Sequence, residues 1–108
     1  MSGIQKQVLV MGNGASPKSG DSVTVHYTGK FLNEVIFDTS ISRGQPFVFS
    51  IDRGQVIPGW DIALKTMALN ETSIFIIPPE MAYGRHGAPP TIPPNSTLLF
   101  EITLLKIN

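Results

Sequence analysis

Residues 55–67 have the sequence QVIPGWDIALKTM, the one stretch of this chain with the pattern of an α-helix. Pro58 suits the first helical turn, where its missing N–H costs nothing, and Asp61 complements the positive end of the helix dipole. A helix of about ten residues is too short to be stable alone in water, so the rest of the chain must cover its apolar face. Spacings of three and four residues place four side chains on that face: Ile57, Trp60, Leu64 and Met67.

The remaining apolar segments have the patterns of β-strands. Alternation of apolar and polar residues predicts a strand with one buried face and one wet face, and in residues 23–28 it places Tyr27 on the buried side. The predicted strands are residues 4–11, 23–28, 47–51, 73–77 and 97–107. About five strands and one short helix indicate an α+β fold, in which a twisted antiparallel β-sheet wraps around the helix.

Two longer segments are predicted to be loops. Residues 39–46 are mostly polar, and they follow an apolar segment that ends at Phe37 and Asp38. Residues 83–95 contain two glycines and four prolines, a composition that supports no regular element and restricts the backbone to a few shapes. Long loops in compact domains are uncommon and are often functional, so residues 83–95 are a candidate functional segment.

The composition limits the class of protein. A chain of 108 residues fits a single domain, residues 1–108, and its 42% apolar and 15% charged residues are typical of a globular protein. The eight basic and eight acidic side chains are scattered, so binding to nucleic acid or to a membrane surface is not expected. The absence of cysteine excludes disulfides and thiol catalysis.

The location is expected to be the cytoplasm. The first six residues, Met1 to Lys6, open no long apolar region, so they do not have the pattern of a secretory signal. No apolar run approaches the ~20 residues that a membrane-spanning helix needs.

The usual catalytic groups are sparse. His26 and His86 lie far apart, without cysteines or clustered carboxylates, so no metal site is expected. His26 falls on the wet face of its strand, where a hydrogen-bonded strand histidine is the favoured interpretation over a ligand or a base. The serines, Ser40 among them, have no histidine or lysine at a recognisable activating spacing. No nucleotide-binding glycine pattern appears, and no cofactor is expected.

Aromatic and branched residues gather instead at strand ends, beside the helix and next to the proline-rich loop. Ordinary core packing is one interpretation of this set. The other is an apolar cup floored by Trp60, with polar groups from Tyr27, Asp38, Arg43 and Tyr83 at its rim. The aromatic and branched residues are Tyr27, Phe37, Phe47, Val56, Ile57, Trp60, Tyr83, Ile92 and Phe100.

Four groups of residues carry a resemblance to a known family. They are His26-Tyr27-Thr28-Gly29, Phe37-Asp38-Thr39-Ser40, Val56-Ile57-Pro58-Gly59-Trp60, and Tyr83-Gly84 through Gly87, Pro89, Ile92-Pro93-Pro94, Leu98 and Phe100. In this order and spacing, over nearly the whole chain, the sequence resembles the small single-domain FKBP-type peptidyl-prolyl cis-trans isomerases. The resemblance implies a twisted antiparallel sheet on one short helix and acceleration of rotation about Xaa-Pro bonds.

The resemblance also implies the site residues. The catalytic set would be Tyr27, Phe37, Asp38, Trp60, Tyr83 and Phe100. Substrate and inhibitor contacts would add Arg43, Phe47, Gln55, Val56, Ile57 and Ile92. Within these sets, Asp38 and Tyr83 match positions that hydrogen-bond the ligand, and Arg43 matches one that orders Tyr27 and Asp38. The partner-selecting loop would present Arg85, His86, Ala88 and Thr91.

The partners implied by the resemblance are proline-containing peptides and proteins, the macrolides tacrolimus and rapamycin, and calcineurin or TOR kinase through a drug-bridged complex. Three positions depart from the best-known members: Gln55 replaces a common glutamate, Ala88 a histidine and Thr91 an isoleucine. These departures concern partner choice and inhibitor affinity more than the reaction.

Two other functions stay open at this point. The cup could be a binding module that grips a proline-like group on a receptor, channel or kinase, with incidental isomerisation. An apolar-ligand carrier is the weaker alternative, because the chain is short for a ligand-enclosing barrel.

Overall fold

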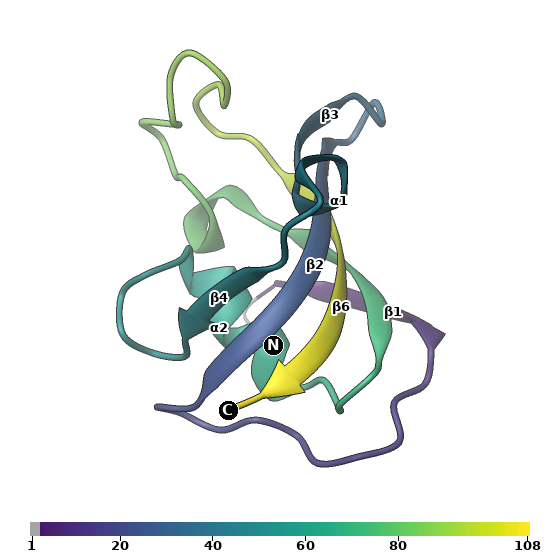
Figure 1. Cartoon of the computed structure of the whole chain (residues 1–108). Coiled ribbons are helices and arrows are strands. Elements are labelled where there is room, and N and C mark those ends of the chain that lie inside the picture. The colour runs from purple at the N-terminus through teal and green to yellow at the C-terminus, as the bar shows by residue number, and fades with distance from the viewer. Residues whose placement is uncertain (1–2) are drawn as a thin grey trace.

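The computed structural model describes residues 3–108, and in this part of the chain six strands form one antiparallel sheet (Figure 1). The strands are β1 (Gln5–Val10), β2 (Ser22–Phe31), β3 (Ile36–Thr39), β4 (Phe47–Ser50), β5 (Thr72–Ile77) and β6 (Leu98–Ile107). Their order is β1-β5-β6-β2-β3, with β4 also paired to β2. The predicted α+β fold is confirmed, with six strands instead of five. The prediction that Met1 to Lys6 are not a secretory signal includes Met1 and Ser2, which lie outside the described residues.

The helix α2 (Pro58–Lys65) lies within the curl of the sheet (Figure 1). Pro58 occupies the first turn, Asp61 lies near the N-terminal end and Lys65 in the last turn, as the dipole favours. The helix is shorter than the stretch 55–67, and its buried residues are Gly59, Trp60, Ala63 and Leu64, with Met67 buried just beyond its end. Between residues 3 and 108, none of the helices has the length and apolar composition of a membrane-spanning segment.

The core lies between α2 and the inward-facing side chains of the strands. The alternation predicted from the sequence is confirmed, because the residues expected to face inward are buried. In β2 these are Val23, Val25 and Tyr27, and in β6 they are Leu98, Phe100, Ile102 and Leu104.

One edge of β2 is shared by two short strands. Residues Ser22–Val25 pair with β4, and residues Thr28–Lys30 pair with β3. Between β3 and β4 the chain leaves the sheet and forms the short helix α1 (Ser40–Arg43). The prediction of a loop at residues 39–46 was therefore wrong for the first five of these residues, of which Thr39 belongs to β3 and the next four to α1.

Local capping explains α1. The Thr39 side chain accepts a hydrogen bond from the Ile41 N–H, and Gly44 ends the helix with φ of 68°. A threonine N-cap and a glycine C-cap are common at helix ends. The segment between them is polar and too short to show any apolar periodicity.

The proline-rich segment 83–95 follows a 3₁₀ turn, η1 (Pro79–Met81), and contains no helix or named strand. Ala88 and Ile92 form an isolated antiparallel bridge, and the Ile92 side chain is buried. At Gly87 an added Cβ would lie 2.4 Å from the Ile92 carbonyl oxygen, so only glycine fits there. The loop is thus closed on itself and anchored to the core.

Candidate active site: an aromatic pocket above Trp60

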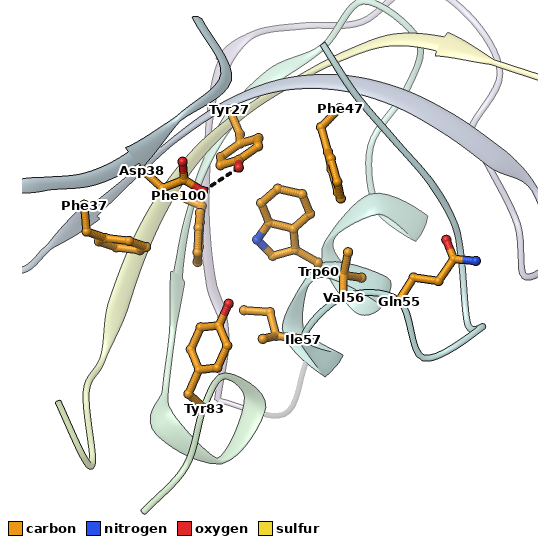
Figure 2. Close-up of a pocket in the computed structure, with 10 residues that line it drawn as sticks. All are labelled: Tyr27, Phe37, Asp38, Phe47, Gln55, Val56, Ile57, Trp60, Tyr83 and Phe100. Carbon is orange, nitrogen blue, oxygen red and sulfur yellow. Dashed lines mark hydrogen bonds between the residues drawn. The ribbon is translucent and has the colours of Figure 1, made fainter. Parts of the chain in front are cut away.

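A cavity of about 160 Å³ opens between β2, β3, β4, α2, β6 and the start of the proline-rich loop (Figure 2). Pockets that enclose drug-sized ligands have roughly 300–1,000 Å³, so this one accepts a single ring rather than a whole large molecule. Its lining residues are Tyr27, Phe37, Asp38, Phe47, Gln55, Val56, Ile57, Trp60, Tyr83 and Phe100.

Trp60 forms the floor of the cavity. It lies in the first turn of α2, and its ring is nearly perpendicular to those of Tyr27, at 4.8 Å between centroids, and Phe100, at 5.3 Å. Such edge-to-face contacts fix the indole more firmly than area burial alone. Among the residues described, Trp60 Nε1 is buried without a hydrogen-bond partner. The floor is therefore rigid and apolar except for one unused donor.

Phe37 and Asp38 are consecutive residues, yet both line the pocket. In a regular strand, neighbouring side chains point to opposite faces. Here the pairing of β2 with β3 shifts: Gly29 pairs with Asp38 and Lys30 with Ile36, which leaves Phe37 as an extra residue. This is a β-bulge, and it turns an aromatic wall and a carboxylate to the same side.

Gly29 makes room for the aromatic walls. A Cβ at this position would lie 2.7 Å from Phe37 Cζ and 2.8 Å from Phe100 Cε1, closer than carbon atoms approach without a shift. The Phe37 and Phe100 rings, 5.7 Å apart and nearly perpendicular, meet over this glycine. A glycine inside a strand often marks a place where another group approaches the backbone closely, so Gly29 was a signal in the sequence for this contact, which the sequence analysis did not predict.

Three polar side chains form a closed network at the rim. The Tyr27 hydroxyl donates to Asp38 Oδ2 at 2.5 Å (Figure 2), while Arg43 donates to Asp38 Oδ1 at 2.5 Å and to the Tyr27 hydroxyl oxygen at 3.0 Å. Burial alone would raise the pKa of Asp38, but the bonds from Tyr27 and Arg43 outweigh it and the pKa is lowered. Burial and the bond to Asp38 raise the pKa of Tyr27. At neutral pH the network therefore holds a carboxylate and a neutral phenol.

Ser40 and His26 form a pair that the sequence did not predict. His26 Nδ1 lies 2.9 Å from Ser40 Oγ, a contact between residues 14 apart in the sequence that the spacing of serines and histidines did not indicate. The pair is structural, because Ser40 is fully buried and its Oγ accepts the Tyr27 N–H at 2.8 Å. This also confirms the interpretation of His26 as a hydrogen-bonded strand histidine. Within residues 3–108 no group of three or more His, Cys, Asp or Glu side chains is placed to hold a metal.

Gln55 and Tyr83 lie at the mouth of the pocket. The Gln55 side-chain oxygen accepts the Ser50 N–H at 2.9 Å, a contact that a glutamate would make equally well. Tyr83 is 41% exposed, and its hydroxyl points toward the cavity (Figure 2). Burial, and then the charge of Asp38, raise the pKa of Tyr83, so its phenol stays protonated and able to donate.

The structure brings together ten of the twelve residues predicted to contact substrate or inhibitor; the other two, Arg43 and Ile92, lie outside the lining. Arg43 contacts Tyr27 and Asp38 from outside the cavity, and the side chain of Ile92, a residue of the proline-rich loop, is buried in the core. The predicted partner-selecting residues are also outside the lining: Arg85, His86 and Thr91 are exposed, and Ala88 is half-buried.

Fold and pocket together define a class: an α+β protein whose curved sheet and short helix enclose a ring-sized aromatic pocket with a polar rim. Comparison with known proteins gives the family. Residues 13–105 match the FKBP-type peptidyl-prolyl cis-trans isomerase family. The chain belongs to this family and is a peptidyl-prolyl isomerase.

Relatives and solved structures agree. The chain is 50% identical over 107 residues to a peptidyl-prolyl cis-trans isomerase of Schizosaccharomyces pombe, covering 98% of this chain and 96% of the relative. It is 50% identical over 98 residues to FK506-binding protein 1 of Saccharomyces cerevisiae, covering 90% and 86%. The crystal structure of AtFKBP13 is similar, with a TM-score of 0.94 and 36% identity, covering 99% of this chain and 94% of that one.

Proposed function

We propose that the pocket above Trp60 is the place where the Xaa-Pro bond is isomerised, and that it works by binding the twisted imide more tightly than either planar form. The observation that supports this proposal is the lining itself. Six of its ten residues are aromatic, it is sized for one ring, and its one carboxylate is held by Tyr27 and Arg43.

The reaction needs no nucleophile, metal or cofactor, because no covalent bond is formed or broken. Rotation about a peptide C–N bond crosses a barrier of ~18–20 kcal/mol because resonance is lost at the half-way twist, and uncatalysed prolyl isomerisation takes tens of seconds. An enzyme accelerates it by stabilising the twisted form over the planar ones. Each ~1.4 kcal/mol of preferential binding gives a tenfold faster rate.

An aromatic pocket provides such a preference. The carbonyl of a planar imide is strongly polarised and well hydrated, whereas that of a twisted imide is less so. Removing water over Trp60 and Phe100 therefore raises the free energy of the planar forms more than that of the twisted form. With the proline ring packed on Trp60, a hydrogen bond from the Tyr83 hydroxyl would hold the adjoining chain in a turned conformation.

The same pocket is proposed to bind tacrolimus and rapamycin. Relatives named FK506-binding protein 1 match over most of both chains, and FK506 is tacrolimus. A macrolide would place one ring in the cavity and rest its remainder on the rim. We also propose that the drug-bound protein forms a complex with calcineurin or TOR kinase, and that the loop residues Arg85, His86, Ala88 and Thr91 select the partner. We further propose a cytoplasmic location and a single domain over residues 1–108. The resemblance described above supports these extensions.

The test is NMR exchange spectroscopy of a Leu-Pro peptide with catalytic amounts of three proteins: wild type, Phe37→Ala and Ile36→Ala. Phe37 is a pocket wall, while its neighbour Ile36 is 54% exposed and outside the lining. We expect wild type and Ile36→Ala to accelerate the exchange equally and Phe37→Ala to lose at least tenfold, a loss of ~1.4 kcal/mol or more in transition-state binding. Equal rates for all three proteins would refute the proposed site.

A further inference from the structure

An apolar surface continues outward from the pocket along the β2–β3 hairpin, which projects at the upper right of Figure 1. The Phe37 ring, a pocket wall, lies 4.9 Å between centroids from the Phe31 ring at the end of β2. Phe31 is only partly buried. The next residue on this side is Val35, which is 54% exposed. We call Phe31 and Val35 the hairpin shelf.

Strand pairing places the two residues of the hairpin shelf on the pocket side. Phe31 pairs with Leu98, which is fully buried, so its side chain faces the core. The pairing of β2 with β3 ends at Lys30 and Ile36, and just beyond it the Phe31 N–H donates to the Val35 carbonyl at 3.0 Å. Because consecutive side chains alternate, Val35 is assigned to the face opposite that of Ile36, which is the face of Phe31. Ile36 pairs with Lys30 and therefore points to the other face, although it is equally exposed at 54%.

The pocket holds one ring, so the residues that flank a bound proline must leave it across the rim. The hairpin shelf begins at Phe31, next to the Phe37 wall, and extends to Val35, which lies two residues from Phe37 and therefore about 7 Å along the strand, since an extended chain rises about 3.3 Å per residue. An extended client segment covers this distance with two or three residues. An exposed apolar surface continuous with a binding pocket favours apolar side chains at that distance.

We propose that the hairpin shelf is an accessory client-binding surface that selects segments with apolar side chains two to three residues from the proline. This inference rests on the proposed function of the pocket and names its substrate class. The occupant is the flank of the same client chain whose proline fills the cavity. The shelf adds binding for extended protein clients and leaves a minimal proline peptide unaffected.

The test compares Val35→Glu with Ile36→Glu. The two variants add the same charge at adjacent, equally exposed positions on opposite faces, so any long-range electrostatic effect is matched. The substrates are a minimal Ala-Leu-Pro-Ala peptide and two extended peptides around the same Leu-Pro core. One extended peptide carries leucine two and three residues away on both sides of the proline, and the other carries serine there. The readouts are kcat/KM from NMR exchange and Kd from Trp60 fluorescence.

We expect wild type to prefer the leucine-flanked peptide over the serine-flanked one by about fivefold, the effect of burying part of two apolar side chains. Val35→Glu should remove most of this preference and leave the minimal peptide unchanged, while Ile36→Glu should behave as wild type. No preference in wild type, or the same change in both variants, would overturn the inference. An equal loss by Val35→Glu on all peptides would also overturn it, because the change would then act on the pocket itself.

Failure of the proposed isomerase function would give a different experimental result from failure of the hairpin shelf. If wild type does not accelerate exchange of the minimal peptide, the isomerase site is refuted. The fluorescence Kd values still decide whether Val35 contacts the flanks, since binding of the leucine-flanked peptide needs no turnover.

Discussion

At the scale of the single residue, the pocket depends on Gly29, where the absent side chain leaves space for two aromatic rings. The Phe37 and Phe100 rings occupy the volume that a Cβ would take. Both rings line the cavity, so any shift in them changes its shape. Gly29 has no side chain and is not among the lining residues, so the chemical groups of the sequence offered no reason to assign it to the site.

Gly29→Ala is expected to lower both stability and catalysis. Overpacking costs ~1–3 kcal/mol in the free energy of unfolding, and displaced walls should lower kcat/KM for a Leu-Pro peptide by at least tenfold. The measurements are chemical denaturation and NMR exchange. Part of the stability loss should disappear in a Phe37→Ala background, because one of the two clashes is then removed. A Gly29→Ala protein with wild-type stability and rate would show that the Phe37 and Phe100 rings can move without cost, and would contradict this role of Gly29.

Asp38 gives the pH dependence at this scale. Its pKa is below the ordinary value of 3.8, so the stabilisation from its network is present above the unfolded-state pKa and is lost as pH falls through the folded-state pKa. Tyr27 and Tyr83 have pKa values above 10, so neither phenol ionises near neutral pH. We expect kcat/KM to be flat between about pH 5 and about pH 9. A titration of the Asp38 carboxyl carbon by NMR should show its inflection below the ordinary value of 3.8, and an inflection at or above that value would contradict the closed network.

At the scale of the element, the site depends on the interruption between β3 and β4. Both strands pair with the same edge of β2, and α1 fills the interval between them. Tyr27 faces this interval, where Ser40 Oγ takes the place of a strand partner by accepting its N–H. The same excursion of the chain carries Arg43 back to Tyr27 and Asp38. One short helix therefore supports the network of Tyr27, Asp38 and Arg43.

Ser40→Ala tests this role of α1. Removing the hydroxyl leaves the buried Tyr27 N–H without its acceptor, which costs ~1–3 kcal/mol in the free energy of unfolding. Ser42→Ala is the matched control, because Ser42 lies on the same helix but is exposed, and its loss should stay within ~0.5 kcal/mol. Urea denaturation measures both variants. If the two substitutions cost the same, Ser40 does not replace a strand partner.

The sequence pattern predicted the elements with strong apolar periodicity and missed the features that depend on local backbone geometry, namely a one-turn helix and a β-bulge. β2, β6 and the start of α2 were correct because their apolar residues repeat at intervals of two or of three and four. α1 has one turn, too short for a period, and the β-bulge at Phe37 leaves no trace in composition. Nine of the ten pocket residues were named from the sequence pattern, which left ordinary core packing and an apolar cup as alternatives, and the family resemblance added Gln55 and favoured the cup. The pairing of Ser40 with His26 depends on tertiary contact between separate elements.

At the scale of the whole molecule, pocket and core share a residue. Trp60 is 4% exposed and belongs to the same buried cluster as the strand residues, yet its ring also lines the cavity. The sheet must curl around α2 to bury that helix, and the curl leaves the aromatic cavity above Trp60. With the proposed site, folding and catalysis are therefore coupled at this residue.

Trp60→Ala should cost ~3–5 kcal/mol in the free energy of unfolding and should also abolish turnover by the molecules that remain folded. Leu64→Ala is the matched control: Leu64 is fully buried on the same helix and outside the pocket lining. It should cost ~2–5 kcal/mol, with normal kcat/KM per folded molecule. Denaturation and NMR exchange at the same temperature measure both. Normal turnover in folded Trp60→Ala would show that the floor is not part of the site.

The central claim is that this one aromatic pocket accelerates prolyl rotation. Its most direct test is the exchange rate of a Leu-Pro peptide, measured by NMR while rapamycin is added to the wild-type protein. We predict that catalytic acceleration falls in proportion to the drug and disappears at one equivalent, because one small ring of the macrolide and the proline ring of the peptide compete for the same cavity. Acceleration that persists with the drug fully bound would contradict the claim.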